Sequence, residues 1–205
     1  QAAGGGGVTL FFLVRHAAHD NVGGFLAGRS PGIVLGEAGI AQAARLGERM
    51  RRERIEAIHA SPRERTQETA AAIAAACGLT EVDIAGALDE IDFGEWSGKT
   101  FAELDADPLW HRWNNERAMA QTPAGETMSD VGRRILDFME TLAAQATDAN
   151  LVLVSHADVI KAAVCRVLDL SFDAWPRFDV SPASITTILA RGGNAELVTL
   201  NEIVP

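Results

Sequence analysis

The sequence VTLFFLVRH occupies residues 8–16, where a run of mostly apolar side chains ends abruptly in Arg15 and His16. A short continuous apolar run predicts a strand that is buried on both faces of a sheet. A guanidinium is very costly to bury without an anion, so Arg15 at the end of this strand requires a negative partner. That partner is either a bound anion or one of the 28 acidic residues of the chain. The stretch therefore predicts a buried strand of an α/β sheet with a charged end.

Helices and strands alternate outward from this strand along most of the 205 residues. Helices are predicted over residues 37–52, 63–77, 127–146 and 158–168, and further strands over residues 55–59, 82–85, 151–154, 185–189 and 196–200. The turn Gly192-Gly193-Asn194 predicts that the last two strands form a hairpin. This order indicates one α/β domain over residues 8–205, a three-layer α/β/α sandwich around a mixed, mostly parallel sheet. Residues 1–7 contain only Ala and Gly after the first glutamine, and we expect a flexible end there.

The spacing of apolar residues also predicts which side chains face the core. Helical periodicity over residues 37–52 places four of them inside: Ile40, Ala44, Leu46 and Met50. Residues 88–121 follow no regular period, yet they hold three of the four tryptophans: Trp96, Trp110 and Trp113. This segment is either a cap over a cleft or a separate aromatic cluster beside the main core.

Composition narrows the class of protein. A net charge of −10 argues against binding of nucleic acid, which needs a basic face. No apolar run approaches the roughly 18 residues of a membrane-spanning helix. Cys77 and Cys165 cannot form a disulfide framework, and they fit a reducing cytoplasm. The oligomeric state stays open, and a homodimer is compatible with the sequence.

A second histidine follows a second apolar strand. His156 comes directly after LVLVS, residues 151–155, just as His16 follows residues 8–15. In open α/β sheets, ligands bind at the carboxyl ends of the strands. If the two strands are neighbours, both imidazoles lie in one crevice, whereas either histidine alone could be an ordinary core residue.

Further charged residues stand where an anion site needs them. Arg63 and Arg65 begin a helix, whose free N–H groups favour negative charge, and the spacing does not choose between them. Several carboxylates lie among apolar residues of the segment LDEIDFGEW, residues 88–96. Partial burial would raise the proton affinity of one of them, as a general acid requires.

These residues resemble the motifs of the histidine phosphatase superfamily, which includes the cofactor-dependent phosphoglycerate mutases. The sequence LVRHA at residues 13–17 is similar to the Arg-His-Gly signature of that family. Five more motifs follow in the family's order and cover nearly the whole chain: LGEAG at 35–39 with Gln42, Ser61 with Arg65 and Thr69, Leu88 with Glu90, Phe93 and Trp96, Pro123 with Gly125, Glu126 and Arg133, and VSH at 154–156.

The resemblance implies a role for each matching residue. His16 would be the nucleophile that becomes a phosphohistidine, and Glu90 would protonate the leaving group and later deprotonate water. Arg15, Arg65 and His156 would bind the transferring phosphoryl oxygens, which suits a reaction driven by positioning and charge. The implied activity is that of a phosphatase that hydrolyses small phosphomonoesters without a metal or other cofactor.

Several positions depart from the family pattern and bear on the substrate. Ala17 replaces a glycine, and Ala18-His19 replaces a Glu-Thr pair. The position of the family's phosphate-binding asparagine falls on Val22. The neighbouring Asn21 could take the place of that asparagine only if the loop shifts by one residue. Ala157-Asp158 replaces two glycines and brings an acid near the pocket. The expected substrate-binding residues are Arg15, Asn21, Gly28, Arg29, Arg65 and Ala157.

Four other functions compete with this one. The first two are a phosphoglycerate mutase-like phosphotransferase and a non-catalytic phosphate-binding module on the same fold. The third is a zinc hydrolase built on His16, His19 and Asp20, although no second cluster of metal ligands completes such a site. A cysteine-based phosphatase is the weakest, because neither cysteine opens a Gly-rich loop that ends in arginine.

Overall fold

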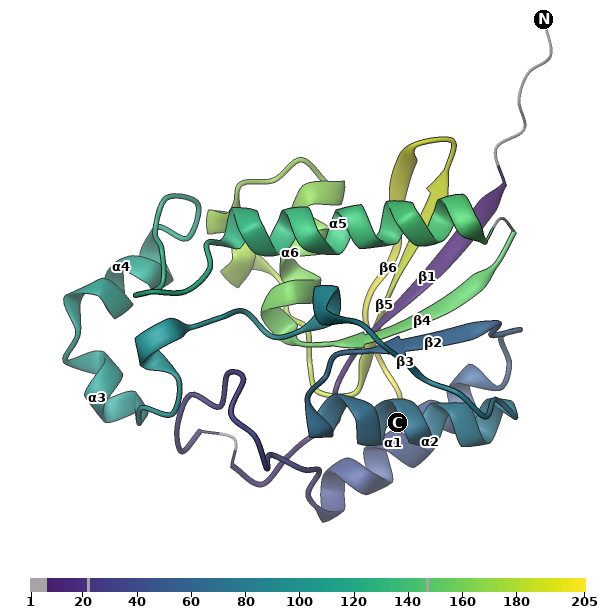
Figure 1. The fold of residues 1–205 in the computed structure, drawn as a ribbon, viewed down its shortest axis with the longest axis horizontal. Coiled ribbons are helices and arrows are strands. Elements are labelled where there is room, and N and C mark those ends of the chain that lie inside the picture. Colours follow the sequence, from purple (N-terminus) through teal and green to yellow (C-terminus); the bar gives the residue numbers. More distant parts are fainter. Residues whose placement is uncertain (1–6, 22, 147) are drawn as a thin grey trace, which may run out of the picture.

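A computed structural model describes residues 7–21, 23–146 and 148–205 (Figure 1). The expected flexible end, residues 1–7, falls outside this range except for Gly7. The described strands form one six-stranded sheet in the order β3-β2-β4-β1-β5-β6. Their bounds are β1 Val8–Arg15, β2 Ala57–Ala60, β3 Asp83–Ile84, β4 Asn150–Ser155, β5 Ser184–Arg191 and β6 Asn194–Ile203. The strands β1 to β4 run parallel and β5 is antiparallel to both of its neighbours, so the predicted mixed, mostly parallel sheet is confirmed.

Helices cover both faces of the sheet, which explains why β1 is mostly apolar on both of its faces. Alternate side chains of a strand point to opposite faces. Phe11 and Leu13 pack in the core under α5 and α6, and Phe12 and Val14 pack in the core under α1 and α2. The helices are α1 Glu37–Met50, α2 Glu64–Cys77, α5 Met128–Gln145 and α6 Ala157–Val167. The three-layer α/β/α sandwich follows directly from this two-sided burial.

The buried face of α1 differs from the predicted one. Ile40 is 62% exposed and Ala44 is also exposed, whereas Leu46 and Met50 are buried as expected. Gly39 and Gly47 occupy the buried stripe instead, because a Cβ on Gly39 would overlap the Ala18 carbonyl oxygen. The close approach of neighbouring backbone therefore selects glycines for the inner face and turns Ile40 outward.

Residues 88–121 are more regular than the sequence indicated. They contain α3 Phe101–Asp105 and α4 Pro108–Asn115, which project beyond the carboxyl ends of the parallel strands (Figure 1). Trp96 and Trp113 are fully buried, and they belong to the same apolar cluster as Phe11 and the inner faces of α5 and α6. Of the two alternatives for this segment, the separate aromatic cluster is thereby excluded, since these tryptophans share the main core.

A buried ion pair ties this cap to α6. Arg117, which follows α4, is only 5% exposed, and one of its terminal nitrogens lies 2.5 Å from the Oδ1 atom of Asp158. Its guanidinium lies over two indole rings, 3.8 Å from the ring centroid of Trp175 and 4.9 Å from that of Trp113. Such stacking supports a charge that has little water around it. Asp158 is thereby fixed at the end of the sheet where His156 lies.

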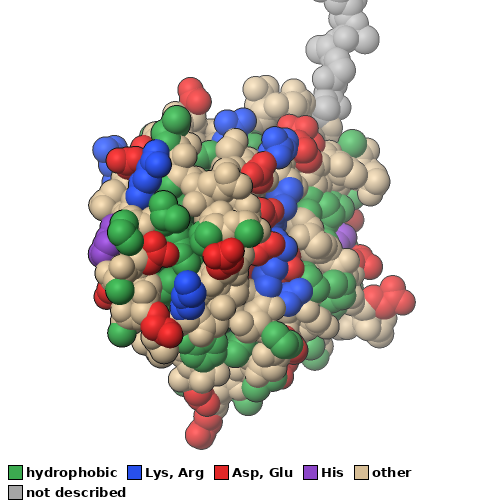
Figure 2. Space-filling view, turned by 60° about the vertical axis from the view of Figure 1, so that its left-hand side comes forward, with side chains coloured by type: hydrophobic (Ala, Val, Ile, Leu, Met, Phe, Trp, Pro, Cys, Tyr) green, Lys and Arg blue, Asp and Glu red, His purple; other side chains and the backbone are tan. Residues whose placement is uncertain are grey.

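The surface mixes charges of both signs. Acidic and basic side chains are interspersed on the face shown in Figure 2. In the part of the chain that the structure describes, no helix is both long and apolar enough to cross a bilayer. Cys77 and Cys165 are free thiols, as expected.

Candidate active site

The sheet brings the two predicted histidines together. β1 and β4 are parallel neighbours, and their register pairs Arg15 with Ser155. The residues that follow, His16 and His156, therefore leave the sheet at the same level. Their ring centroids lie 5.3 Å apart with the planes at 60°. Both side chains are buried, at 4% and 0% exposure.

Hydrogen bonds fix the tautomer of His16. Its Nδ1 atom lies 2.8 Å from the carbonyl oxygen of Ala17, and because a carbonyl only accepts, Nδ1 carries the proton. The lone pair is thus on Nε2. Burial, together with the charges of Arg65 and Arg15, holds the pKa of His16 well below its usual range. His16 is therefore a neutral imidazole with one free nitrogen at neutral pH.

The tautomer of His156 follows from its partners in the same way. A terminal nitrogen of Arg65 lies 3.2 Å from Nδ1 and must donate, so Nδ1 is the acceptor. Nε2 then donates to the Ser61 hydroxyl at 2.8 Å. Burial, with the proximity of His16 and Arg65, lowers the pKa of His156 well below its usual range. Ser61 belongs to one of the predicted motifs, but no role was predicted for it.

Two guanidiniums lie beside the histidines without a carboxylate partner. Arg65 is 1% exposed. Within the described residues, its Nε atom and one of its terminal nitrogens have no hydrogen-bond partner, and neither does the Nε atom of Arg15. Besides the contact of Arg65 with His156, the two side chains donate to main-chain oxygens, 2.8 Å from Arg65 to Gly28 and 2.7 Å from Arg15 to Val180. A buried cation without a counter-ion is costly. The site is therefore built to receive an anion.

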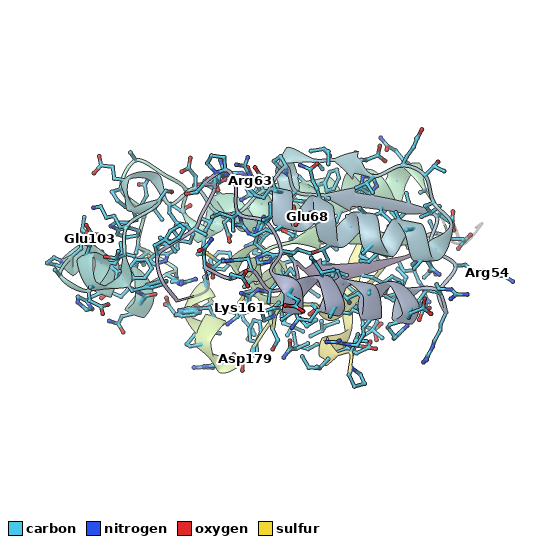
Figure 3. The ribbon with its side chains drawn as sticks, turned by 90° about the horizontal axis from the view of Figure 1, so that it is seen from below. Arg54, Arg63, Glu68, Glu103, Lys161 and Asp179 are labelled. Atoms are coloured by element: carbon cyan, nitrogen blue, oxygen red, sulfur yellow. The ribbon has the colours of Figure 1, made fainter. Side chains whose placement is uncertain are left out.

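The other two candidate arginines are occupied. Arg63, labelled in Figure 3, forms an ion pair with Asp89 at 2.9 Å. Arg29 donates to the main-chain oxygen of Glu90 at 2.8 Å and lies 3.1 Å from a carboxylate oxygen of Glu126. The structure therefore separates Arg65 from Arg63, and it places the side chain of Arg29 behind Glu90, among acidic groups, instead of free for a substrate.

Glu90 faces the buried histidines. Its Oε2 atom lies 3.5 Å from Nδ1 of His156, and its Oε1 atom accepts the main-chain N–H of Ile91 at 2.9 Å. Burial raises the pKa of Glu90 to about 7, assisted by the negative charge of Asp158 and opposed by Arg65. A carboxyl with this pKa can hold a proton near neutral pH and can also give it up.

A network of ion pairs supports the main chain of Glu90. Glu126 lies 2.9 Å from the Nε atom of Arg134, and Arg134 donates 2.6 Å to the carbonyl oxygen of Ala87. Glu126 also accepts the main-chain N–H of Asp92 at 2.9 Å, which fixes the loop on both sides of Glu90. The sequence singled out Glu126 and Arg133, but Arg133 is exposed and its neighbour Arg134 makes these contacts.

The remaining predicted substrate-binding residues are scattered. Gly28 is buried and offers its carbonyl oxygen to Arg65, so it positions the arginine. Ala157 is half-buried at the first position of α6, directly after His156. Asn21 is exposed, and its side chain makes no hydrogen bond among the described residues. Val22, where the family's asparagine falls, lies outside the described residues.

No cluster of metal ligands accompanies the site in residues 7–21, 23–146 and 148–205. A groove of about 720 Å³ lies between α5, α6 and the β5–β6 hairpin. None of the candidate residues lines it. The candidate site is thus formed by the loops at the carboxyl ends of the strands, away from this groove.

Comparison with known proteins agrees with this arrangement. The family model of the histidine phosphatase superfamily (branch 1) matches residues 11–203. The chain is 32% identical over 187 residues to phosphoserine phosphatase 1 of Hydrogenobacter thermophilus, covering 88% of this chain and 86% of that protein. It is 30% identical to a probable phosphoglycerate mutase of Yersinia pestis, over 86% of this chain and 83% of the mutase. The structure of a mycobacterial glucosyl-3-phosphoglycerate phosphatase superposes with a TM-score of 0.85 at 27% identity, covering 95% and 99% of the two chains. The chain therefore belongs to the histidine phosphatase superfamily.

Proposed function

We propose that this protein hydrolyses phosphomonoesters of small molecules through a phosphohistidine on His16. The observation that carries the proposal is the pair of guanidiniums of Arg65, which is buried, and Arg15, which is half-buried. Their N–H groups without a partner among the described residues lie beside an imidazole with an unprotonated Nε2. A phosphoryl group supplies the missing negative charge, and forked N–H donors match its oxygens. Relatives named as phosphatases support hydrolysis of a phosphate ester.

The first transfer uses His16 as the nucleophile and Glu90 as the acid. Nε2 of His16 forms a bond to phosphorus while the bond from phosphorus to the ester oxygen breaks. The proton on Glu90 moves to that oxygen, so the leaving group departs as a neutral alcohol. Arg15, Arg65 and His156 stabilise the charge on the phosphoryl oxygens during the transfer.

The second transfer regenerates the enzyme. Glu90, now a carboxylate, takes a proton from a water molecule whose oxygen attacks phosphorus. The bond from phosphorus to Nε2 breaks, and inorganic phosphate leaves. A pKa of about 7 suits Glu90 to both roles, because neither the acid nor the base form is scarce at neutral pH.

Trapping of the intermediate tests this function. Wild-type protein is mixed with ³²P-labelled phosphomonoesters and quenched in alkali, where a phosphohistidine survives and an acyl phosphate does not. We expect label on His16 and release of phosphate to water. Absence of label and of phosphate across a broad panel would favour a non-catalytic binding module. Preferential transfer to a hydroxy acid added in competition with water would favour the mutase.

The pH dependence of kcat/KM should report the state of Glu90. The first transfer needs protonated Glu90, so kcat/KM is expected to decline above a pH of about 7. Because the charge of Asp158 contributes to the raised pKa, Asp158→Asn should move this decline to lower pH. The measurement is a pH–rate profile with an alkyl phosphate, with thermal melting to verify the fold, since Arg117 loses its partner in this variant.

Glu90→Gln provides the matched control for this profile. It should lose roughly 10²- to 10⁴-fold on an alkyl phosphate, far less on an aryl phosphate whose leaving group needs no proton, and the alkaline decline should vanish. If the alkaline decline persists in Glu90→Gln, the titrating group is not Glu90. The same conclusion follows if the decline occurs at the same pH in Asp158→Asn as in the wild type.

A further inference from the structure

His19 adjoins the active site, and the mechanism above gives it no role. Its ring centroid lies 5.7 Å from that of His16, with the two planes tilted by 30°. The ring of His156 lies 5.3 Å from the same imidazole. The nucleophile therefore has two imidazole neighbours, of which only His156 has an assigned function.

Anchored main chain sets the position of His19. The N–H of Ala17 donates to the Thr69 hydroxyl at 3.0 Å, and the N–H of Ala18 donates to the side-chain oxygen of Gln42 at 2.9 Å. Gly39 packs directly against the carbonyl of Ala18 and leaves no room for a side chain. The segment between His16 and His19 is thus held by both α1 and α2.

Among the residues that the structure describes, the side chain of His19 has no hydrogen-bond partner. Its Nδ1 atom is buried without a hydrogen bond, and the imidazole makes none with the described residues. Buried polar atoms without a partner are rare in native proteins and call for an explanation such as a bound ligand. Burial, together with the charges of Arg65 and Arg15, lowers the pKa of His19. A neutral imidazole always carries one N–H, so His19 has a donor to offer.

The two arginines identify the ligand that this donor would meet. His19 lies beside His16, and His16 lies beside His156, whose Nδ1 atom accepts a hydrogen bond from Arg65 at 3.2 Å. An anion drawn into the site by Arg15 and Arg65 brings acceptor oxygens to the neighbourhood of both imidazoles. The free N–H of His19 would then be paired by the ligand and not by the protein.

We propose that His19 is a phosphoryl-binding residue, which donates a hydrogen bond to a non-bridging oxygen of the phosphoryl group attached to, or approaching, His16. This inference rests on the proposed function. His19 would act beside Arg15, Arg65 and His156 and would hold the transferring group from the side of the loop that follows β1.

Binding of inorganic phosphate and orthovanadate, measured by isothermal titration calorimetry, tests this role without turnover. His19→Ala should raise the Kd for both anions roughly 10- to 100-fold, the range of a hydrogen bond to a charged group. His19→Gln keeps an N–H donor and should recover most of the affinity. His111→Ala removes an exposed histidine of the cap and should bind both anions like the wild type.

The outcomes separate this inference from the proposed function. Affinity within about twofold of wild type in His19→Ala would overturn the role of His19, and so would equal losses in His19→Ala and His19→Gln. If His19→Ala fails to fold, His19→Leu replaces it in the same comparison with His19→Gln. A wild type that binds phosphate but forms no phosphohistidine would instead refute the proposed mechanism and leave the anion-binding role of His19 in place.

Discussion

His16→Ala is expected to abolish phosphate release, with a loss on the order of 10⁴-fold or more in kcat. The reason is that Nε2 of His16 is the atom to which phosphorus is transferred. The other histidine of the site, His156, cannot replace it. His156 uses Nε2 to donate to Ser61 and Nδ1 to accept from Arg65, so it has no free lone pair. Phosphate release from a panel of esters measures the effect.

Two controls make this result specific. His16→Ala should still bind inorganic phosphate, because Arg15 and Arg65 remain in place and keep their unpaired N–H groups. Its thermal melting should confirm a folded protein, although the variant removes a buried ring. A folded His16→Ala that releases phosphate at more than a few per cent of the wild-type rate would refute the phosphohistidine intermediate.

Arg65→Gln is expected to lower kcat/KM by about 10²- to 10³-fold. Arg65 is almost fully buried and holds two nitrogens free for the phosphoryl group, and it also donates to His156. Gln keeps a polar tip but loses the charge and the fork of donors. Kinetics with a fixed ester and calorimetry with phosphate should show the loss together.

Arg63 offers a matched control two residues away, directly before the first residue of α2. Arg63→Gln removes one arginine of the same chain segment, but its guanidinium is already neutralised by Asp89 at 2.9 Å. We expect kcat/KM of Arg63→Gln to stay within about tenfold of the wild-type value, because this substitution alters only the surroundings of Glu90. Equal losses in the two variants would mean that general positive charge, and not the contact from Arg65, supports catalysis.

Local sequence patterns predicted most of the fold because burial on two faces leaves a clear signature. Continuous apolar strands such as residues 8–14 and 151–154, separated by amphipathic helices, are compatible with few arrangements other than a covered parallel sheet. The pattern failed where packing is tighter than average. Ile40 is exposed because Gly39 and Gly47 bring α1 close to neighbouring backbone, and helical periodicity does not distinguish a glycine face from a polar one.

The sequence by itself determined the elements of the site: a histidine after each of two apolar strands, an arginine that no buried strand would otherwise carry, and motifs in the order of one family. Only the tertiary structure decided which of these groups are free to act. Arg65 and Arg63 look alike in the chain, and they differ because Asp89 lies beside one and not the other. Distances between residues that are remote in sequence likewise determine the raised pKa of Glu90 and the pairing of Arg29 with Glu126. The conformation of a loop determines how closely His19 approaches His16. Electrostatic interactions depend on separation and burial, which residue types along a chain do not encode locally.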